Sequence, residues 1–443
     1  MALFGLKKLF GSTQKVASPS ADETSPPPAA PSLPGDFLQR SAIFDRKNRP
    51  AGHLFHLRQA SADASAPTAQ QRQFDDALLN TLLTTPEAWS SSRAFVPISS
   101  ASLGHPAVDR LAKPNLVLNI QLAEEDNEPD ALIERLGQLR QGGLAIGIFR
   151  QPRHPAFARA IAQADFAIID IAHSEAGAIR DFSAAIRAGE SAHPVRLFGL
   201  DIDTPDEHHL CHQWHFELFH GRFAMNDNPK PDRPHADPHK VLLFNLLRLV
   251  QGDAENPEIV EALKQDPLLT FRILRYLNSP GLGLSHKIES INQALVILGR
   301  QRLTRWLAVL LFSAREPDFG DWLLVESALT RGRLMEVLGA ELLPERSQDA
   351  LFMTGIFSCL DKLLRRPLPE ALNTMPLPEV VRQALLERSG PLAALLDVAE
   401  ASEAFDLARI ESAANKAGLP AATVNRALLA ATAWASEVTE HWE

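Results

Sequence analysis

Short apolar runs alternate with amphipathic helical segments between residues 36 and 225. In Pro129–Arg140, for example, Leu132 and Leu136 fall on one helical face. Strands that alternate with helices at this spacing are typical of parallel βα units, and enough of them predict a (β/α) TIM-like barrel of the α/β class. The expected strands are Leu116–Leu122, Leu144–Phe149, Phe166–Ile171, Val195–Ile202 and Phe216–Phe219, with further helices at Glu175–Ala188 and after Thr204.

Helical periodicity dominates from residue 241 to the last residue, and no strand pattern interrupts it. This half of the chain therefore predicts an all-α domain. Helices are expected at Val241–Val250, Gln301–Phe312, Asp321–Leu338, Gln348–Leu364, Pro378–Glu387 and Leu392–Ala401.

The stretch Asp266–Gly299 predicts two helices joined by a bend. Asp266 and Pro267 suit the start of the first helix, because an aspartate caps and a proline needs no backbone donor there. The segment 278–281, Asn-Ser-Pro-Gly, should end that helix. A capping-box pattern opens the second helix, and Gly299 is its expected stop.

Two proline-rich segments set the expected domain boundaries. Residues 1–35 are rich in Ser, Ala and Pro and cannot bury enough apolar surface to offset their ordering entropy, so they predict a disordered tail. Residues 226–240 hold four prolines and predict a linker. The globular domains are then 36–225 and 241–443.

The first eleven residues place five large apolar side chains around two lysines. This pattern fits a short amphipathic anchor on a membrane surface or a partner. Eleven residues bury little area, so incidental hydrophobes at a frayed start are the preferred interpretation.

Composition narrows the class of protein. The chain has 443 residues with 45% hydrophobic and 22% charged residues, which is ordinary for a soluble globular protein. A net charge of −10 argues against nucleic-acid binding, which needs a basic face. Cys211 and Cys359 lack metal-site spacing and fit a reducing cytoplasm. The sequence shows neither an eighteen-residue apolar run nor a secretory cleavage pattern.

The stretch Asp266–Gly299 resembles the HDOD domain, an all-helical bacterial signalling module related to HD hydrolases. The HD hydrolases bind metal through an adjacent His-Asp pair, and Ser358 and Cys359 stand at the matching positions here. The resemblance therefore implies a domain without a metal site. The signature residues that carry it, all read as structural, are Asp266, Pro267, Asn278, Ser279, Gln293 and Gly299.

The first globular region resembles an EAL domain, the barrel that hydrolyses cyclic di-GMP. The resemblance rests on the segments Arg40–Asp45 and Gly52–Arg58 and on the strand spacing. EAL followed by HDOD is a known bacterial arrangement and covers nearly all of residues 36–443. The family implies two divalent cations, held by carboxylates and one Asn at the C-terminal ends of the strands.

Most of the polar positions that this family implies are replaced here. Ser41 stands for a substrate-binding Gln, and Arg150 adds positive charge where the metals should lie. Some of the pattern is kept: Asp203 and Thr204 match an acidic-Thr pair. The family has a Gln-Gly dipeptide at the position of His220 and Gly221, so here the Gly is kept and the Gln is replaced by His. The family also has a Lys two residues before Asp170, and this Lys is missing here. The replaced positions are Leu54, Pro97, Asn119, Phe149, Arg150, Ile168 and Leu200. The resemblance thus predicts a degenerate EAL domain with no bound metal or cofactor.

Two further groups of reactive side chains have plain structural interpretations. Cys359 has no histidine or other base nearby in sequence, so a buried thiol is preferred over a nucleophile. His208, His212 and His215 share a helix face that could bind a transition metal, but a solvated face is preferred.

Together these observations predict a non-catalytic, cytoplasmic pseudoenzyme of a cyclic di-GMP-related signalling pathway that acts by binding protein partners. Control of motility or biofilm formation is implied by the resemblance alone. Because polar residues are missing, binding of cyclic di-GMP is also expected to be weak. Two alternatives stay open: an active cyclic di-GMP phosphodiesterase with an atypical site, and a nucleic-acid-associated HDOD regulator. Arginines such as Arg300 and Arg305 are expected on solvated helix edges rather than at a partner.

Overall fold

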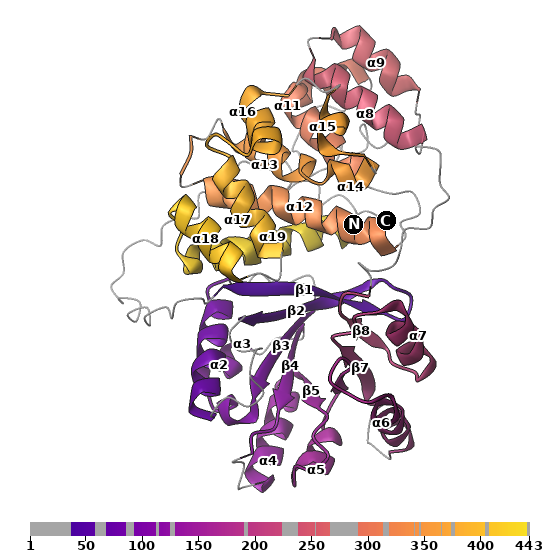
Figure 1. The fold of residues 1–443 in the computed structure, drawn as a ribbon, viewed down its shortest axis with the longest axis vertical. Coiled ribbons are helices and arrows are strands. Elements are labelled where there is room, and N and C mark those ends of the chain that lie inside the picture. Colours follow the sequence, from indigo (N-terminus) through magenta and orange to yellow (C-terminus); the bar gives the residue numbers. More distant parts are fainter. Residues whose placement is uncertain are drawn as a thin grey trace.

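A computed structural model shows the arrangement of both globular regions (Figure 1). The predicted tail 1–35, its anchor 1–11 and most of the predicted linker lie outside the described residues; the last three linker residues, 238–240, instead begin a helix. The described residues are 37–57, 68–85, 93–111, 115–124, 129–189, 194–223, 238–252, 254–265, 291–312, 319–340, 342–344, 347–364, 366–373, 377–403 and 407–440.

The N-terminal region is a closed barrel, as the alternating pattern predicted. Each of the five strands expected from the sequence is present, with its ends shifted by two residues at most. In chain order the strands are β1 (Leu38–Asp45), β2 (Pro50–Leu57), β3 (Ala94–Ser99), β4 (Leu116–Gln121), β5 (Ala145–Phe149), β6 (Phe166–Asp170), β7 (Arg196–Leu200) and β8 (Leu218–His220).

Strand β1 is antiparallel to both of its neighbours, whereas the other strands pair in parallel. It is antiparallel to β2 through a turn at Asn48, whose φ is 55°, and antiparallel to β8, where Ile43 faces His220. The remaining pairs, from β2–β3 round to β7–β8, are parallel. The C-terminal ends of β2 to β8 therefore meet at one mouth, together with the N-terminal half of β1.

The inside of the barrel is filled by apolar side chains. Because side chains alternate along a strand, every second residue points inward. The inner cluster is made of Ile43, Leu54, Phe95, Val117, Phe166, Ile168, Phe198, Leu200 and Leu218. Its aromatic rings meet edge to face, with Phe95 centred 5.5 Å from Phe166 and 5.3 Å from Phe198.

Helices cover the outer face of the barrel. Helix α7 has the predicted start: the Thr204 hydroxyl accepts from the Glu207 N–H, and the Glu207 carboxylate accepts in return from the Thr204 N–H, forming a capping box. The helices of this region are α2 (Thr68–Leu83), η2 (Ser100–Ser102), α3 (Pro106–Leu111), α4 (Pro129–Gln141), α5 (Phe157–Ile161), α6 (Ala176–Ala188) and α7 (Pro205–Gln213).

The described part of the second region is helical, as predicted. The expected helix Gln348–Leu364 is interrupted at Ser358 and Cys359, where the Cys359 N–H donates to the Ile356 carbonyl at 3.1 Å. The helices are α8 (Pro238–Gln251), α9 (Asn256–Lys264), α11 (Ile291–Phe312), α12 (Phe319–Gly339), α13 (Gln348–Phe357), α14 (Leu360–Leu364), α15 (Leu368–Leu372), α16 (Glu379–Arg382), the π-helical η5 (Gln383–Glu387), α17 (Ala393–Glu403), α18 (Leu407–Ala417) and α19 (Ala421–Glu440). None of the described helices is long and apolar enough to cross a bilayer.

Gly299 breaks helix α11 without ending it. Its φ of 70° and ψ of 163° are not helical, so a kink separates the residues before it from those after it. The expected stop is thus present as a kink, and the predicted helix Gln301–Phe312 follows directly. The predicted first helix of this stretch, and its bend, lie outside the described residues.

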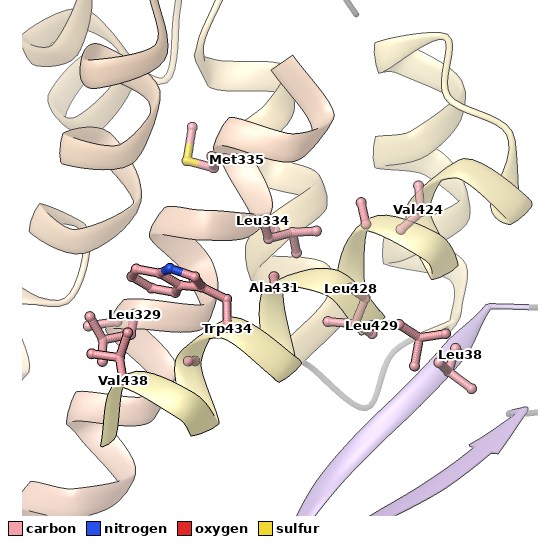
Figure 2. Close-up of a cluster of buried hydrophobic side chains, with 14 of the residues drawn as sticks. Leu38, Leu329, Leu334, Met335, Val424, Leu428, Leu429, Ala431, Trp434 and Val438 are labelled. Atoms are coloured by element: carbon pink, nitrogen blue, oxygen red, sulfur yellow. The ribbon is translucent and has the colours of Figure 1, made fainter. Parts of the chain in front are cut away.

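The barrel packs against the helical region through β1. Leu38 at the start of β1 lies beside Leu428 and Leu429 of α19 in a buried apolar cluster that also contains Leu334 of α12 (Figure 2). The backbone N–H of Leu38 donates to Asn425 Oδ1 at 2.7 Å. Strand β1 therefore belongs to the barrel sheet and also packs against the helical region.

Candidate functional site

The positions at which the family pattern is replaced lie together at the mouth of the barrel. Residues two apart on a strand point the same way, so Ser41 shares the inward side of Ile43, and Asn119 that of Val117. The strand register brings these positions next to one another across neighbouring strands. The observed pairs are Ser41 with Leu54, Pro97 with Asn119, Phe149 with Ile168, and Asp170 with Leu200.

These residues do not fit the two cations of an EAL enzyme. Leu54, Ile168 and Leu200 stand at three of the implied polar positions and are buried among other apolar side chains. Hard divalent cations need several converging oxygen ligands. In the described part of the chain, no group of three or more His, Cys, Asp or Glu side chains is arranged to hold a metal ion. The mouth therefore lacks the set of oxygen ligands that the metal chemistry of that family uses.

The barrel interior contains polar atoms with unmet hydrogen-bonding capacity. Asn119 on β4 is 0% exposed, and neither its Oδ1 nor its Nδ2 finds a partner among the described residues. Gln39 on β1 accepts from His56 Nε2 at 2.9 Å, but its own Nε2 has no partner there. Buried polar atoms are normally satisfied, and leaving one unmet costs about 1–3 kcal/mol. These amides can therefore bind water or another polar group inside the mouth.

A rim of charged side chains follows strands β6 and β7. Partial burial raises the pKa of the Asp201 carboxyl, and the charges of Asp170 and Asp203 raise it further. Arg222 donates to both oxygens of Asp203, at 2.9 and 3.0 Å, and so lowers the pKa of Asp203. A hydrogen bond from exposed His173 to Asp170, at 2.9 Å, raises the pKa of that histidine. The rim therefore mixes cationic and anionic groups within one opening.

Ser41 and His220 are in direct contact at this mouth. Ser41 Oγ lies 2.8 Å from His220 Nε2, and His220 Nδ1 lies 3.5 Å from Asp201 Oδ1. Sequence reasoning named Ser41 and His220 only as replacements of two family glutamines and did not bring them together. The antiparallel pairing of β1 with β8 brings the two residues together, and the spacing of residues in the sequence does not reveal that pairing.

In the helical region a guanidinium lies beside the positions where an HD hydrolase has its metal-binding pair. Arg331 of α12 donates to Ser358 Oγ at 2.7 Å and to the Glu403 carboxylate at 2.6 and 2.9 Å. Burial is the main cause that raises the pKa of Cys359, to about 11. Both observations agree with the expected buried thiol and with a structural role for this pair.

The histidines of α7 are held by aromatic and backbone contacts. His208 stacks on Phe223 with ring centroids 4.2 Å apart, and His212 binds the Arg46 side chain at 3.1 Å. His215 lies beyond the end of α7 with a φ of 65°, so the expectation that it shares a helix face is wrong. These residues form no metal-binding group within the described residues.

Other predicted positions have simpler outcomes. Of the HDOD signature, Asp266, Pro267, Asn278 and Ser279 lie outside the described residues, whereas Gln293 is exposed on α11. Arg300 is exposed and donates to the Gly252 and Ala254 carbonyls. The solvated helix edge expected for Arg305 is wrong, because this side chain is 11% exposed and pairs with Glu336. The protein partner expected for this region stays a prediction.

Comparisons with known proteins find one matching family and two relatives that are similar over most of the chain. Residues 239–375 match the HDOD domain. The chain is 25% identical over 411 residues, covering 91% of it and 93% of the relative, to the cyclic di-GMP phosphodiesterase CdgJ of Vibrio cholerae. It is 24% identical over 379 residues to the uncharacterized protein YuxH of Bacillus subtilis, covering 83% of this chain and 90% of that protein.

Solved structures that are similar to this chain include one with an EAL domain and one in complex with cyclic di-GMP and manganese. The YkuI protein of Bacillus subtilis, with an EAL domain and in complex with cyclic di-GMP and calcium, aligns with a TM-score of 0.34 and 12% identity, covering 52% of this chain and 72% of that one. BlrP1 of Klebsiella pneumoniae, in complex with manganese and cyclic di-GMP, aligns with a TM-score of 0.34 and 18% identity, covering 44% and 56%.

The relative from Vibrio cholerae corrects one expectation. A non-catalytic pseudoenzyme was predicted from the lost metal positions, and that prediction is wrong by this comparison: the relative, which matches nine-tenths of the chain, is named a phosphodiesterase. The prediction rested on the replaced family positions alone.

Proposed function

We propose, from the premise that this chain joins an EAL-like barrel to an HDOD domain, that it is a phosphodiesterase that opens cyclic di-GMP at the barrel mouth. The full-length similarity to a named cyclic di-GMP phosphodiesterase is the observation that carries this proposal. The mouth supports it, because parallel-strand barrels place their active sites at the C-terminal ends of the strands.

The mouth offers groups that suit a cyclic dinucleotide. Such a ligand presents two anionic phosphodiesters and two guanine edges, which need cations and amide-type donors and acceptors. Arg150 follows β5 at this edge, and His173 carries a raised pKa that favours its cationic form. The buried Asn119 amide can donate and accept at once, which matches a guanine edge or a phosphate oxygen.

Perturbed titratable groups also concentrate here. Asp201, His173 and His220 all have shifted pKa values, and all three lie at the rim or just inside it. Environments that separate the pKa values of neighbouring groups are typical of catalytic sites.

Hydrolysis by the full-length chain tests the proposal. Purified protein is incubated with cyclic di-GMP, and the linear dinucleotide is separated by chromatography, with and without EDTA. We expect linear product, and we expect Arg150→Ala to raise KM by about tenfold through loss of a charged phosphate contact. The matched control is Arg159→Ala, an exposed arginine of α5 that pairs with Asp130. Cyclic di-GMP left intact by stoichiometric protein would refute the proposal.

A further inference from the structure

Strand β1 carries polar side chains on both of its faces at three consecutive positions. Gln39 and Ser41 point into the barrel, where Gln39 accepts from His56 Nε2 at 2.9 Å and Ser41 Oγ lies 2.8 Å from His220 Nε2. Because side chains alternate along a strand, Arg40 points to the opposite face, outside the barrel. One short segment therefore contributes to the mouth on one side and to another contact on the other.

The outer contact of this segment is made with helix α12 of the helical region. Arg40 donates through Nη1 to Glu326 Oε1 at 2.5 Å and through Nη2 to Thr330 Oγ1 at 3.4 Å. Glu326 and Thr330 are four residues apart on one face of α12, so the helix lies across the outside of the strand. His53 of β2 reaches the same Glu326 oxygen, at 2.5 Å. A single buried carboxylate thus holds two neighbouring strands.

The helical region takes the place of a covering helix over β1 (Figure 1). Strands β1 and β2 are joined by the short turn 46–49 and not by a helix, unlike a βα unit. Helix α17 packs on β1, and Asn425 of α19 accepts from the Leu38 N–H at 2.7 Å. The position of β1 within the barrel wall therefore depends on contacts with the second region.

A displacement of Arg40 must also move its two neighbours in the chain. Gln39 pairs with His56 of β2, and Ser41 pairs with Leu54, so the segment moves as part of a hydrogen-bonded ladder. Within the described residues Gln39 Nε2 has no hydrogen-bond partner, which leaves it available to a polar ligand. The outer contact thus bears on groups that a ligand in the mouth would meet.

A purely structural interface is the alternative explanation for the contact. However, a buried ion pair often stabilises a protein no more than apolar side chains of similar volume, so stability alone does not require one here. A guanidinium with two acceptors one helical turn apart adds a fixed register between strand and helix. Such a register matters most where Arg40 stands, between two residues of the mouth.

We propose that Glu326, acting through Arg40, is a positioning residue of the barrel mouth, which sets where Gln39 and Ser41 present their polar groups to a ligand. The inference rests on the proposed function for the identity of that ligand, a cyclic dinucleotide. It makes affinity at the mouth depend on how α12 lies against β1. By linkage, a partner that draws α12 away lowers this affinity, and the bound dinucleotide opposes that movement by the same factor.

The first experiment measures the position of β1 without any ligand. Ser41→Cys is introduced into the full-length chain, and the reaction of the new thiol with an aromatic disulfide reagent is followed. The native Cys211 and Cys359 are buried, so the new thiol is the reporter. We expect the additional change Glu326→Ala to speed this reaction by about tenfold, because the strand is released from α12. Glu326→Gln keeps an oxygen that accepts from Arg40 and should give an intermediate rate.

The matched control separates positioning from general loss of stability. Arg331→Met changes another buried residue of α12, one that binds Ser358 and Glu403 inside the helical region. It should leave the rate of the new thiol within about twofold of the Ser41→Cys parent. An unchanged rate in both Glu326 variants overturns the inference. An equal rise in Arg331→Met overturns it too, as does simultaneous reaction of Cys211 and Cys359, since both report a general loosening.

The second experiment connects the contact to the ligand. Binding of cyclic di-GMP to the full-length chain is measured by calorimetry, without the Ser41→Cys change. We expect Kd to rise by about tenfold in Glu326→Ala, a coupling of ordinary size between linked sites, and by less than about twofold in Arg331→Met. An equal rise in the two variants overturns the inference and leaves the proposed function standing. An unmodified chain that neither binds nor cleaves the dinucleotide refutes the proposed function, and the thiol measurement then decides the positioning role by itself.

Discussion

Arg40 of β1 donates to Glu326 of α12 at 2.5 Å and so ties the barrel to the helical region. His53 of β2 reaches the same Glu326 oxygen at 2.5 Å. The side chains of His53 and Glu326 are buried, and that of Arg40 is 13% exposed. Arg40 immediately precedes Ser41 in the chain. Because neighbouring residues on a strand point to opposite faces, the helical region holds β1 from outside while Ser41 faces the mouth inside.

Removing the shared acid should weaken the whole assembly. Glu326→Ala leaves Arg40 buried without its partner, and breaking a buried pair in this way costs about 3–5 kcal/mol. We expect a fall of that size in the free energy of unfolding, measured by urea denaturation. The control is Glu387→Ala, an exposed residue of η5, expected to change stability by about 0.5 kcal/mol or less. Equal effects of the two variants would contradict the importance of the contact.

The same contact predicts a dependence of stability on pH. Burial alone would raise the pKa of Glu326, but the charges of Arg40 and His53 outweigh it and lower that pKa to about 2. The folded-state pKa lies below the ordinary value, so the stabilisation is complete above about pH 4.5 and is lost as the pH falls toward 2. Glu326→Gln cannot titrate. Its stability deficit relative to the unmodified chain should therefore shrink in urea denaturation series taken from pH 7 to pH 3; a constant deficit would refute this assignment.

Arg331 should be a stability residue of the helical region. Arg331→Met removes the donor of Ser358 and leaves Glu403 without its main cationic partner, so we expect a loss of about 3 kcal/mol in the free energy of unfolding. Arg382→Met is the matched control, because Arg382 forms an exposed pair with Glu379 of the kind that contributes about 1 kcal/mol or less. Thermal unfolding monitored by circular dichroism compares them. A similar midpoint for both variants would show that Arg331 is dispensable.

Gly147 of β5 should tolerate no side chain. A Cβ there would lie 2.6 Å from Ile168 Cδ1 and 2.8 Å from Asn119 Oδ1, both inside the barrel. Gly147→Ala is expected to destabilise the protein by about 1–3 kcal/mol through overpacking. The control Gly137→Ala lies in α4 with no atom within 4 Å of the new Cβ, so it should stabilise by about 0.5–1 kcal/mol. Chemical denaturation of both variants measures these opposite signs, and the same sign for both would contradict the packing argument.

The two cysteines should be unreactive in the folded protein. Cys211 and Cys359 are buried, and burial is the main cause that raises their pKa values to about 12 and about 11. Because the thiolate is the reactive form, an aromatic disulfide reagent at pH 8 should titrate neither thiol in the native chain and both after denaturation. Rapid reaction of the folded protein would place at least one thiol at the surface.

The sequence by itself determined the architecture of this protein. Its alternation of short apolar runs with helical segments was enough to predict the barrel, because period-two and helical patterns record which face of each element is buried. The loss of metal ligands at Leu54 and Leu200 could also be read from the sequence, because a leucine side chain has no ligand atom in any fold. The capping box at Thr204 and the break at Gly299 were also visible, since both depend on a few consecutive residues.

Only the tertiary structure decided which reactive groups meet. Ser41 and His220 are separated by 179 positions and Ser41 was read as a lost glutamine, yet barrel closure joins them. The antiparallel direction of β1 carries Ser41 to the same mouth as the ends of the parallel strands, and no local pattern specifies that direction. Strand pairing between distant segments is set by the closure of the whole sheet, so a contact of this kind has no signature in the letters near either residue.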